Sequence, residues 1–93
     1  MHPVTREDVN DYLWKILKEK KKIDITGMKN DTSLKMLELD SFGFLEVIFS
    51  LEHQYDIDFP KEYEHIQTIG DVSGITYNLV LNKLHAQSKE ISG

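Results

Sequence analysis

The sequence predicts an all-α domain with three long helices, one short helix and a long loop between the first two long helices. Apolar residues recur with the helical period of about 3.6 residues in the long segments, and a helix-start signal precedes each of these segments. No stretch alternates apolar and polar residues over the length of a strand between turn signals. A chain of 93 residues forms one domain at most.

The first helix is expected to begin near Thr5, because Thr5-Arg6-Glu7-Asp8 resembles a capping box with Asp in the usual Glu position. Its apolar residues occupy one stripe, about 140° wide at 100° per residue, which predicts a single core-facing side. They are Val9, Tyr12, Leu13, Ile16 and Leu17. The lysine-rich segment 18–22 follows, and we interpret it as a solvated helix end whose cations complement the helix dipole.

Residues 23–40 are expected to form a loop, because they contain several turn-forming residues and only dispersed apolar ones. The turn formers are Gly27, Asn30, Asp31 and Thr32. The loop is predicted to contain a short helical turn around residues 33–37. A loop of this length is unusual in so small a domain, which indicates a functional role.

The second helix is expected from Ser41 to Tyr55, with Asp40 as its N-cap. Its apolar residues sweep about 220° of the helical wheel, more than a one-sided surface helix needs. Such a helix either lies centrally in a bundle or presents apolar surface to another molecule. The apolar residues are Phe42, Phe44, Leu45, Val47, Ile48, Phe49, Leu51 and Tyr55.

The rest of the chain is expected to form a short helix and then the last long one. Pro60 cannot continue a helix interior but can open a new helix, so a short helix is predicted at residues 61–65. Thr68-Ile69-Gly70-Asp71 resembles another capping box and opens the last helix. Its core stripe is expected to be Val72, Ile75 and Leu79. Residues 87–93 are expected to be a flexible tail.

Charge and composition narrow the possible functions. The net charge is −5; residues 1–30 contain 7 Lys or Arg and 5 Asp or Glu, whereas residues 31–93 contain 4 and 11. An acidic surface opposes nucleic-acid binding and favours docking to basic patches on proteins. The chain has no cysteine, which excludes disulfides and thiolate metal sites.

Membrane and metal functions are not expected either. No apolar run approaches the roughly 20 residues of a membrane-spanning helix, and the first residues lack the regions of a signal peptide. We therefore expect a cytoplasmic protein without an integral membrane segment. The histidines lack metal-ligand spacing, and Asp56 and Asp58 lack the remainder of a calcium loop, so no metal site is expected.

Asp40 and Ser41 are the candidate chemical site. Ser41 lies on the first turn of the predicted second helix, where unpaired amide donors and the positive end of the dipole favour an anion. A phosphodiester esterified to the Ser41 hydroxyl would be stabilised at this position. Asp40 would cap the helix or help to bind a metal ion during the modification.

The residues around this serine resemble those of a known family. Leu39-Asp40-Ser41-Phe42, followed by Leu45-Glu46, is similar to the phosphopantetheine attachment motif of acyl carrier proteins, which is Asp-Ser-Leu with Glu five residues after the Ser. The resemblance extends over roughly residues 5–85. It implies an acyl-carrier-like four-helix bundle over residues 1–86. Further similar segments are residues 32–37, 51–60 and 68–79.

The resemblance implies a specific function. Ser41 would receive 4′-phosphopantetheine from coenzyme A by the action of a phosphopantetheinyl transferase, with Asp40 as its partner in the motif. The thiol of this arm would hold an acyl group as a thioester, so the cofactor would supply the sulfur that the chain lacks. The chain would deliver acyl intermediates to enzymes of fatty-acid, polyketide or specialised lipid biosynthesis and would not be an enzyme itself.

The resemblance also implies a surface for partner enzymes, which would include acyl-carrier synthetases, ketosynthases or acyltransferases. Apolar residues of the first, second and last helices would line a cleft for the acyl chain. Weak, charge-steered docking of a monomer would allow rapid exchange between partners. The residues expected to contact partners are Phe42, Glu46, Val47, Glu52, Glu62 and Glu64.

Some residues depart from the family pattern and indicate a specialised carrier rather than the bulk fatty-acid one. Phe42 stands where Leu is usual, and Glu38 replaces a common Gly. Acidic residues are often found at the positions of Gly43, His53 and Gln54. An aminoacyl, D-alanyl or peptidyl carrier and an unmodified docking module remain as alternatives. A small enzyme is a further alternative, although it lacks a paired acid–base or nucleophile–base signature.

Overall fold

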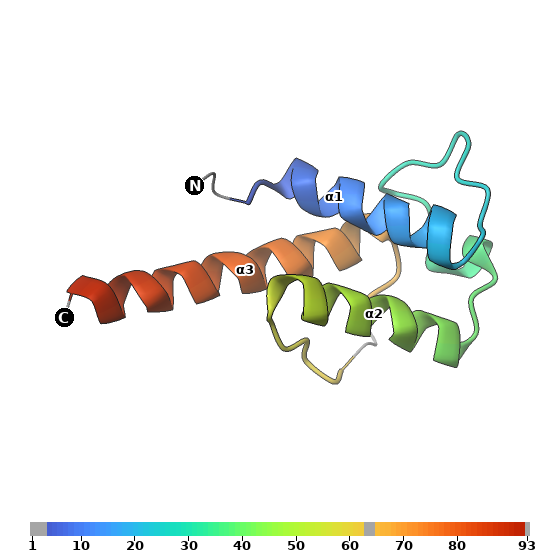
Figure 1. The fold of residues 1–93 in the computed structure, drawn as a ribbon. Helices are drawn as coiled ribbons and strands as arrows, with labels where there is room; N and C mark the ends of the chain where they lie inside the picture. The colour runs from blue at the N-terminus through green and yellow to red at the C-terminus, as the bar shows by residue number, and fades with distance from the viewer. Residues whose placement is uncertain (1–3, 63–64, 93) are drawn as a thin grey trace.

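The computed structural model describes residues 4–62 and 65–92 and is all-helical over that part of the chain (Figure 1). The α-helices are α1 (Arg6–Lys15), α2 (Ser41–Tyr55) and α3 (Ile69–Ser92). The short helical turns are the π-helical η1 (Ile16–Lys20), which continues α1, and the 3₁₀-helical η2 (Leu34–Leu37). The described residues contain no strand, only an isolated bridge between Ser33 and Thr68. The all-α prediction is therefore confirmed, as is the turn predicted before α2.

The predicted helix starts are confirmed by their caps. The Thr5 hydroxyl accepts from the N–H of Asp8 at 3.1 Å, and the Asp8 carboxylate accepts from the N–H of Thr5 at 3.0 Å. Thr68 and Asp71 make the same reciprocal pair at the start of α3, at 3.1 Å and 3.0 Å. The N–H of Gln67, together with the donors of Thr68, holds the pKa of Asp71 below its usual value.

The short helix predicted at residues 61–65 is not confirmed. Lys61 lies in a bend, Glu62 is irregular and His65 lies in a turn, while residues 63–64 lie outside the described part of the chain. The predicted total of four helices is therefore not confirmed. The chain before Lys61 has no regular secondary structure, and the side chains of Ile57 and Phe59 pack in the core, at 8% and 5% exposure.

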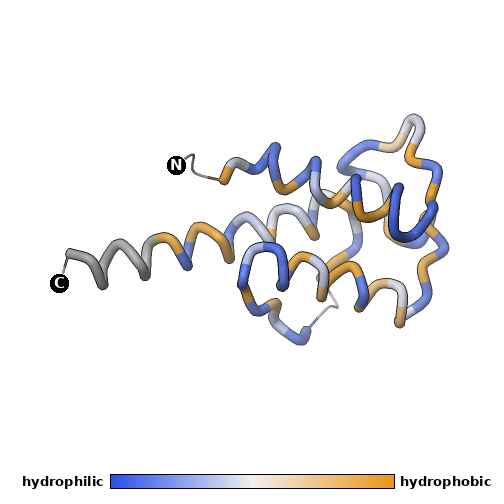
Figure 2. The backbone as a smooth tube through the Cα atoms, in the orientation of Figure 1, coloured by the Kyte–Doolittle hydropathy of each residue, from blue (hydrophilic) through white to orange (hydrophobic). Residues whose placement is uncertain are grey.

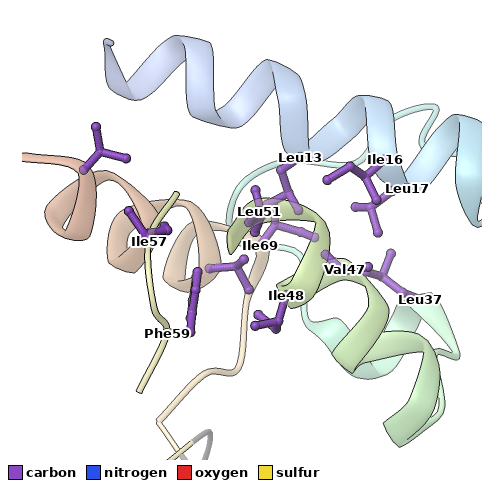
Figure 3. Packing of buried hydrophobic residues seen from close by; sticks show 12 residues of the cluster. Leu13, Ile16, Leu17, Leu37, Val47, Ile48, Leu51, Ile57, Phe59 and Ile69 are labelled. Atoms are coloured by element: carbon purple, nitrogen blue, oxygen red, sulfur yellow. The ribbon is translucent and has the colours of Figure 1, made fainter. Parts of the chain in front are cut away.

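A single apolar cluster joins the elements, as Figure 3 shows. Along α1 and α2, hydrophobic positions recur between hydrophilic ones, so each helix offers one side to this cluster (Figure 2). The core stripe predicted for the first helix is confirmed: its members are buried except Tyr12, which is half-buried, packs against the cluster and meets Tyr55 edge-on with ring centroids 5.8 Å apart. The buried members of the cluster are Leu13, Ile16, Leu17, Leu37, Val47, Ile48, Leu51, Ile57, Phe59, Ile69, Val72 and Val80.

Backbone hydrogen bonds attach the long loop to the N-terminal end of α3. The N–H of Gly70 donates to the carbonyl of Asn30 at 2.6 Å, and the N–H of Ile69 donates to the carbonyl of Thr32 at 3.1 Å. The N–H of Leu34 donates to the carbonyl of Gln67 at 2.8 Å. These bonds hold η2 in place and so fix the position from which the chain enters α2.

The contact between Gly70 and Asn30 leaves no room for a side chain. A Cβ at residue 70 would lie 3.0 Å from the Asn30 carbonyl oxygen, so the backbone would have to shift. We expect Gly70→Ala to lower the free energy of unfolding by about 1–2 kcal/mol. Gly74→Ala is the matched control, because its Cβ would meet only the Arg6 guanidinium, at 3.4 Å, and because Ala favours the helix by about 1 kcal/mol. Urea denaturation of both variants checks this, and equal stabilities would contradict it.

The end of α2 is tied to α3 by a lysine. Asp56 caps α2 in the left-handed conformation, with a φ of 53°. Lys83 donates to the Asp56 carboxylate at 2.6 Å and to the Asp56 carbonyl at 2.9 Å. The hydrogen bond from Lys83, followed by its charge, holds the pKa of Asp56 below its usual value.

Lys83→Met is expected to lower the melting temperature at neutral pH. Because the pKa of Asp56 is lower in the folded protein than in the unfolded chain, this stabilisation is present above the usual Asp pKa. It is lost as the pH falls through the folded-state pKa, so the difference between wild type and variant should shrink in acid. Thermal melts over a pH series measure it, with the exposed Lys61→Met as control. A difference that does not change with pH would argue against the Asp56 pair.

Candidate functional site

Ser41 is an exposed residue on the first turn of α2. Asp40 precedes it as the N-cap, and the Asp40 carboxylate accepts from the N–H of Gly43 at 2.6 Å. The N–H of Phe44 donates to the Asp40 carbonyl at 2.9 Å, which closes the first turn. The N–H groups of Ser41 and Phe42 come before the first intrahelical bond and point toward the region in front of the helix. The predicted position of Ser41 at a helix start is confirmed.

Two unusual backbone positions shape the approach to Ser41. Glu38 ends η2 in the left-handed conformation, with a φ of 55°, where the resemblance led us to expect a glycine. Gly43 permits a close approach, because a Cβ there would lie 3.1 Å from the Asp40 carboxylate and 3.2 Å from the Leu39 side chain. Gly43 therefore allows the Asp40 cap to close over the start of α2.

An open cleft of about 440 Å³ lies directly beside Ser41. This volume is within the range of about 300–1,000 Å³ that is usual for ligand pockets. Most of its walls are apolar, and Lys35, Asp40 and Ser41 supply its polar groups. The sequence predicted a cleft formed by the first, second and last helices, whereas the walls come from η2, the loop, α2 and Ile66. The lining residues are Leu34, Lys35, Leu39, Asp40, Ser41, Phe44, Leu45 and Ile66.

The residues expected to contact partners do not form one acidic surface. Phe42 is 71% exposed, directly after Ser41. Val47 is only 3% exposed and packs in the core, so its expected contact with partners is corrected: it faces the apolar cluster rather than the surface. Glu46 is exposed, but its carboxylate pairs with Lys21 at 2.6 Å.

The remaining acidic residues that were expected to contact partners differ in their surroundings. Glu52 is half-buried, and its carboxylate accepts from the N–H of Phe59 at 2.8 Å, which fixes the chain after α2. Glu62 is exposed. Glu64 lies outside the described residues. The two acids expected along α2, Glu46 and Glu52, therefore each make a contact within the chain, and their contact with partners stays a prediction.

The lysines at the end of the first helix have a role that the sequence did not reveal. We expected the segment 18–22 to be a solvated helix end, but Lys21 binds Glu46, and Lys20 lies 3.5 Å from the Ser50 hydroxyl. Lys20 is the last residue of the π-helical turn η1 and Lys21 is its C-cap, whose N–H donates to the carbonyl of Ile16 at 3.2 Å. In the sequence, the only sign of these contacts with α2 was a surplus of lysines after the first helix, together with the small number of acids in α2.

Comparison with known proteins decides the family. The phosphopantetheine attachment site family matches residues 11–75, which contain Asp40, Ser41 and all of α2. The chain belongs to the acyl carrier protein family. An acyl carrier protein of Clostridium acetobutylicum is 38% identical over 52 residues, which cover 54% of this chain and 68% of that relative. Members of this family carry 4′-phosphopantetheine and are not themselves catalysts.

The residues at the start of α2 of this carrier fit the cofactor. The Ser41 hydroxyl is exposed, the first-turn amides can stabilise a phosphate, and the cleft lies beside both. The described residues include no group of three His, Cys, Asp or Glu that could hold a metal ion. None of the helices described here is long and apolar enough to cross a membrane.

Two substitutions separate the capping role of the Asp40 side chain from its negative charge. We expect Asp40→Ala to lower the free energy of unfolding by about 1 kcal/mol, because the N–H of Gly43 loses its acceptor. Asp40→Asn retains a side-chain oxygen at this position and should stay close to the wild type in stability. Chemical denaturation of the three proteins measures this. If Asp40→Ala were as stable as Asp40→Asn, the cap would not determine the start of α2.

Proposed function

We propose that Ser41 carries the 4′-phosphopantetheine of this acyl carrier protein and that the chain delivers acyl groups to biosynthetic enzymes. The observation that supports this most strongly is the exposure of Ser41 at the N-terminus of α2, beside a cleft with apolar walls. The bound arm supplies the thiol that forms a thioester with the acyl group, which no side chain of this cysteine-free protein supplies.

The residues around Ser41 have distinct parts in this proposal. The Ser41 hydroxyl is the point of attachment: its oxygen bonds to the pantetheine-bearing phosphorus of coenzyme A, its proton is lost, the pyrophosphate bond breaks and adenosine 3′,5′-bisphosphate leaves. The N–H groups of Ser41 and Phe42 and the dipole of α2 stabilise the negative charge of that phosphodiester. Asp40 keeps the first turn closed through Gly43 and so holds Ser41 on the surface.

The cleft beside Ser41 is suited to hold part of the cargo. Leu34, Leu39 and Ile66 are partly buried residues that contact the core and also line the cleft. Covering an apolar acyl chain with such walls is favourable by about 25 cal/mol for each Å² removed from water. This favours an acyl cargo over an aminoacyl or D-alanyl group, whose ammonium would lose hydration in the same place.

The wider assignment follows from the same proposal. The acyl group belongs to fatty-acid, polyketide or specialised lipid synthesis, and the departures Phe42 and Gly43 favour a specialised carrier. Its partners are a phosphopantetheinyl transferase, which modifies it, and acyl-carrier synthetases, ketosynthases or acyltransferases, which use it. These reactions take place in the cytoplasm. The carrier domain corresponds to residues 1–86, and the chain itself has no catalytic activity.

Modification of Ser41 is tested by intact mass spectrometry. After incubation with coenzyme A and a broad-specificity phosphopantetheinyl transferase, the mass of the wild type should rise by about 340 Da. Ser41→Ala should not change in mass, whereas Ser50→Ala, which removes a hydroxyl farther along α2, should be modified like the wild type. Modification of Ser41→Ala, or an unmodified wild type after exhaustive incubation, would contradict the proposal.

A further inference from the structure

The cleft beside Ser41 contains a basic side chain, that of Lys35. Among the described residues that line this cleft, Lys35 is the only cation and Asp40 the only anion. Lys35 comes from η2 and Ser41 from the first turn of α2, and these two elements lie at the same end of the molecule (Figure 1). Lys35 is exposed, so its hydrated ammonium can move within the reach of a flexible four-carbon stem. The cleft therefore holds a cation together with the hydroxyl that receives the arm.

The backbone that carries Lys35 is held in place. The N–H of Lys35 donates to the Ser33 hydroxyl at 3.3 Å, and its carbonyl accepts from the N–H of Glu38 at 3.3 Å. The N–H of the preceding residue, Leu34, donates to the carbonyl of Gln67 at 2.8 Å. Only the Lys35 side chain has to become ordered in order to bind an anion, so the entropic cost is confined to its rotamers.

The ammonium of Lys35 is not engaged in an ion pair within the described part of the chain. The lysines that form ion pairs there are Lys21 and Lys83. The Asp40 carboxylate accepts from the N–H of Gly43 and is not paired with Lys35, although both residues line the cleft. Lys35 can therefore bind an anion that the unmodified chain does not contain.

Attachment of the arm changes the charge of this cleft. Before modification the charges of Lys35 and Asp40 cancel, and the phosphodiester then adds a negative charge. Its phosphorus is bonded to the Ser41 oxygen itself, so this charge lies at the cleft in whichever direction the rest of the arm points. Asp40 is the next residue in the chain, and its carboxylate repels the added charge. Of the two charged residues in the cleft, only Lys35 stabilises the phosphodiester.

We propose that Lys35 is a positioning residue that pairs with the phosphodiester on Ser41. The contact is a charge-assisted hydrogen bond from the ammonium to a phosphate oxygen. It joins η2 to the first turn of α2 and so turns the start of the arm toward the apolar walls of the cleft rather than into solvent. This inference rests on the proposed function, because attachment at Ser41 supplies the anion.

Comparison of the unmodified and modified proteins separates this pairing from a structural role of Lys35. The melting temperature is measured before and after attachment of the arm. Relative to its effect on the wild type, modification should lower the melting temperature of Lys35→Gln by about 2–4 °C, as expected for one exposed ion pair in a domain of this size. Lys35→Arg should restore the wild-type response. Lys29→Gln, which removes the same charge from an exposed position in the long loop, should behave like the wild type.

Salt provides a second check on the charge pairing. In about 1 M NaCl, where the Debye length is about 3 Å, the difference between the wild type and Lys35→Gln in their response to modification should disappear. A difference that persists unchanged in high salt would contradict an exposed ion pair.

A carboxylate introduced at residue 41 tests the same pairing without a transferase. Ser41→Glu places a negative charge at this position, and Ser41→Gln is its neutral match. Adding Lys35→Gln should lower the melting temperature of the Ser41→Glu chain by about 2–4 °C more than that of the Ser41→Gln chain. Circular dichroism before each melt shows that each variant is folded.

Several results would overturn the pairing while modification of Ser41 still held. These are an equal effect of Lys35→Gln on the modified and unmodified proteins, or the same response from Lys29→Gln. An effect that appears only after an acyl group is loaded would also overturn it, because Lys35 would then contact the cargo. Failure of the wild type to be modified contradicts the proposed function, and the Ser41→Glu comparison then still decides whether Lys35 stabilises an anion at residue 41.

Discussion

The start of α2 depends on the contact between the Asp40 carboxylate and the N–H of Gly43, at 2.6 Å. This hydrogen bond ends the loop and begins the helix, and it holds Ser41 on the exposed first turn. Gly43 lets this contact form without crowding, because a Cβ there would lie 3.1 Å from that carboxylate and the carboxylate would have to shift slightly. The dipole, the free first-turn amides and the cleft are useful for attachment of a phosphate only because they meet at this point.

The fold around this point is held from two sides. The loop is hydrogen-bonded to the N-terminal end of α3 through Asn30 and Gly70, and the apolar cluster packs α2 against the first helix. At the other end of α2, Lys83 binds the left-handed cap residue Asp56. The helix that carries Ser41 is therefore fixed at both ends, while its outward side remains open.

Local sequence signals were enough to predict the helix starts, whereas the expectation that Ser41 is the attachment residue came from the resemblance to a family motif. Capping residues and helical periodicity are properties of neighbouring residues, so Thr5, Asp40 and Thr68 could be identified without tertiary information. The short helix after Pro60 was not confirmed, because proline permits a helix start but does not require one, and Lys61 lies in a bend and His65 in a turn. Val47 was assigned to the partner surface from the resemblance, and the wide apolar arc of α2 gave no local signal that this residue faces the core.

The pairing of charged side chains was the least predictable property, because the partners are distant from each other in sequence. Glu46 was expected to meet a basic partner, but its pair is Lys21, and Glu52 is used by the N–H of Phe59. An acidic net charge therefore coexists with an α2 helix whose two acids make contacts within the chain.

The central claim is that the exposed Ser41 hydroxyl bears the arm in the living cell. Tandem mass spectrometry of peptides from the protein, isolated from its own cells without added transferase, tests this most directly. We expect the phosphopantetheine group, free or acylated, on the peptide that contains Ser41 and on no other. Finding every copy of that peptide unmodified, or the group on a different residue, would contradict the account.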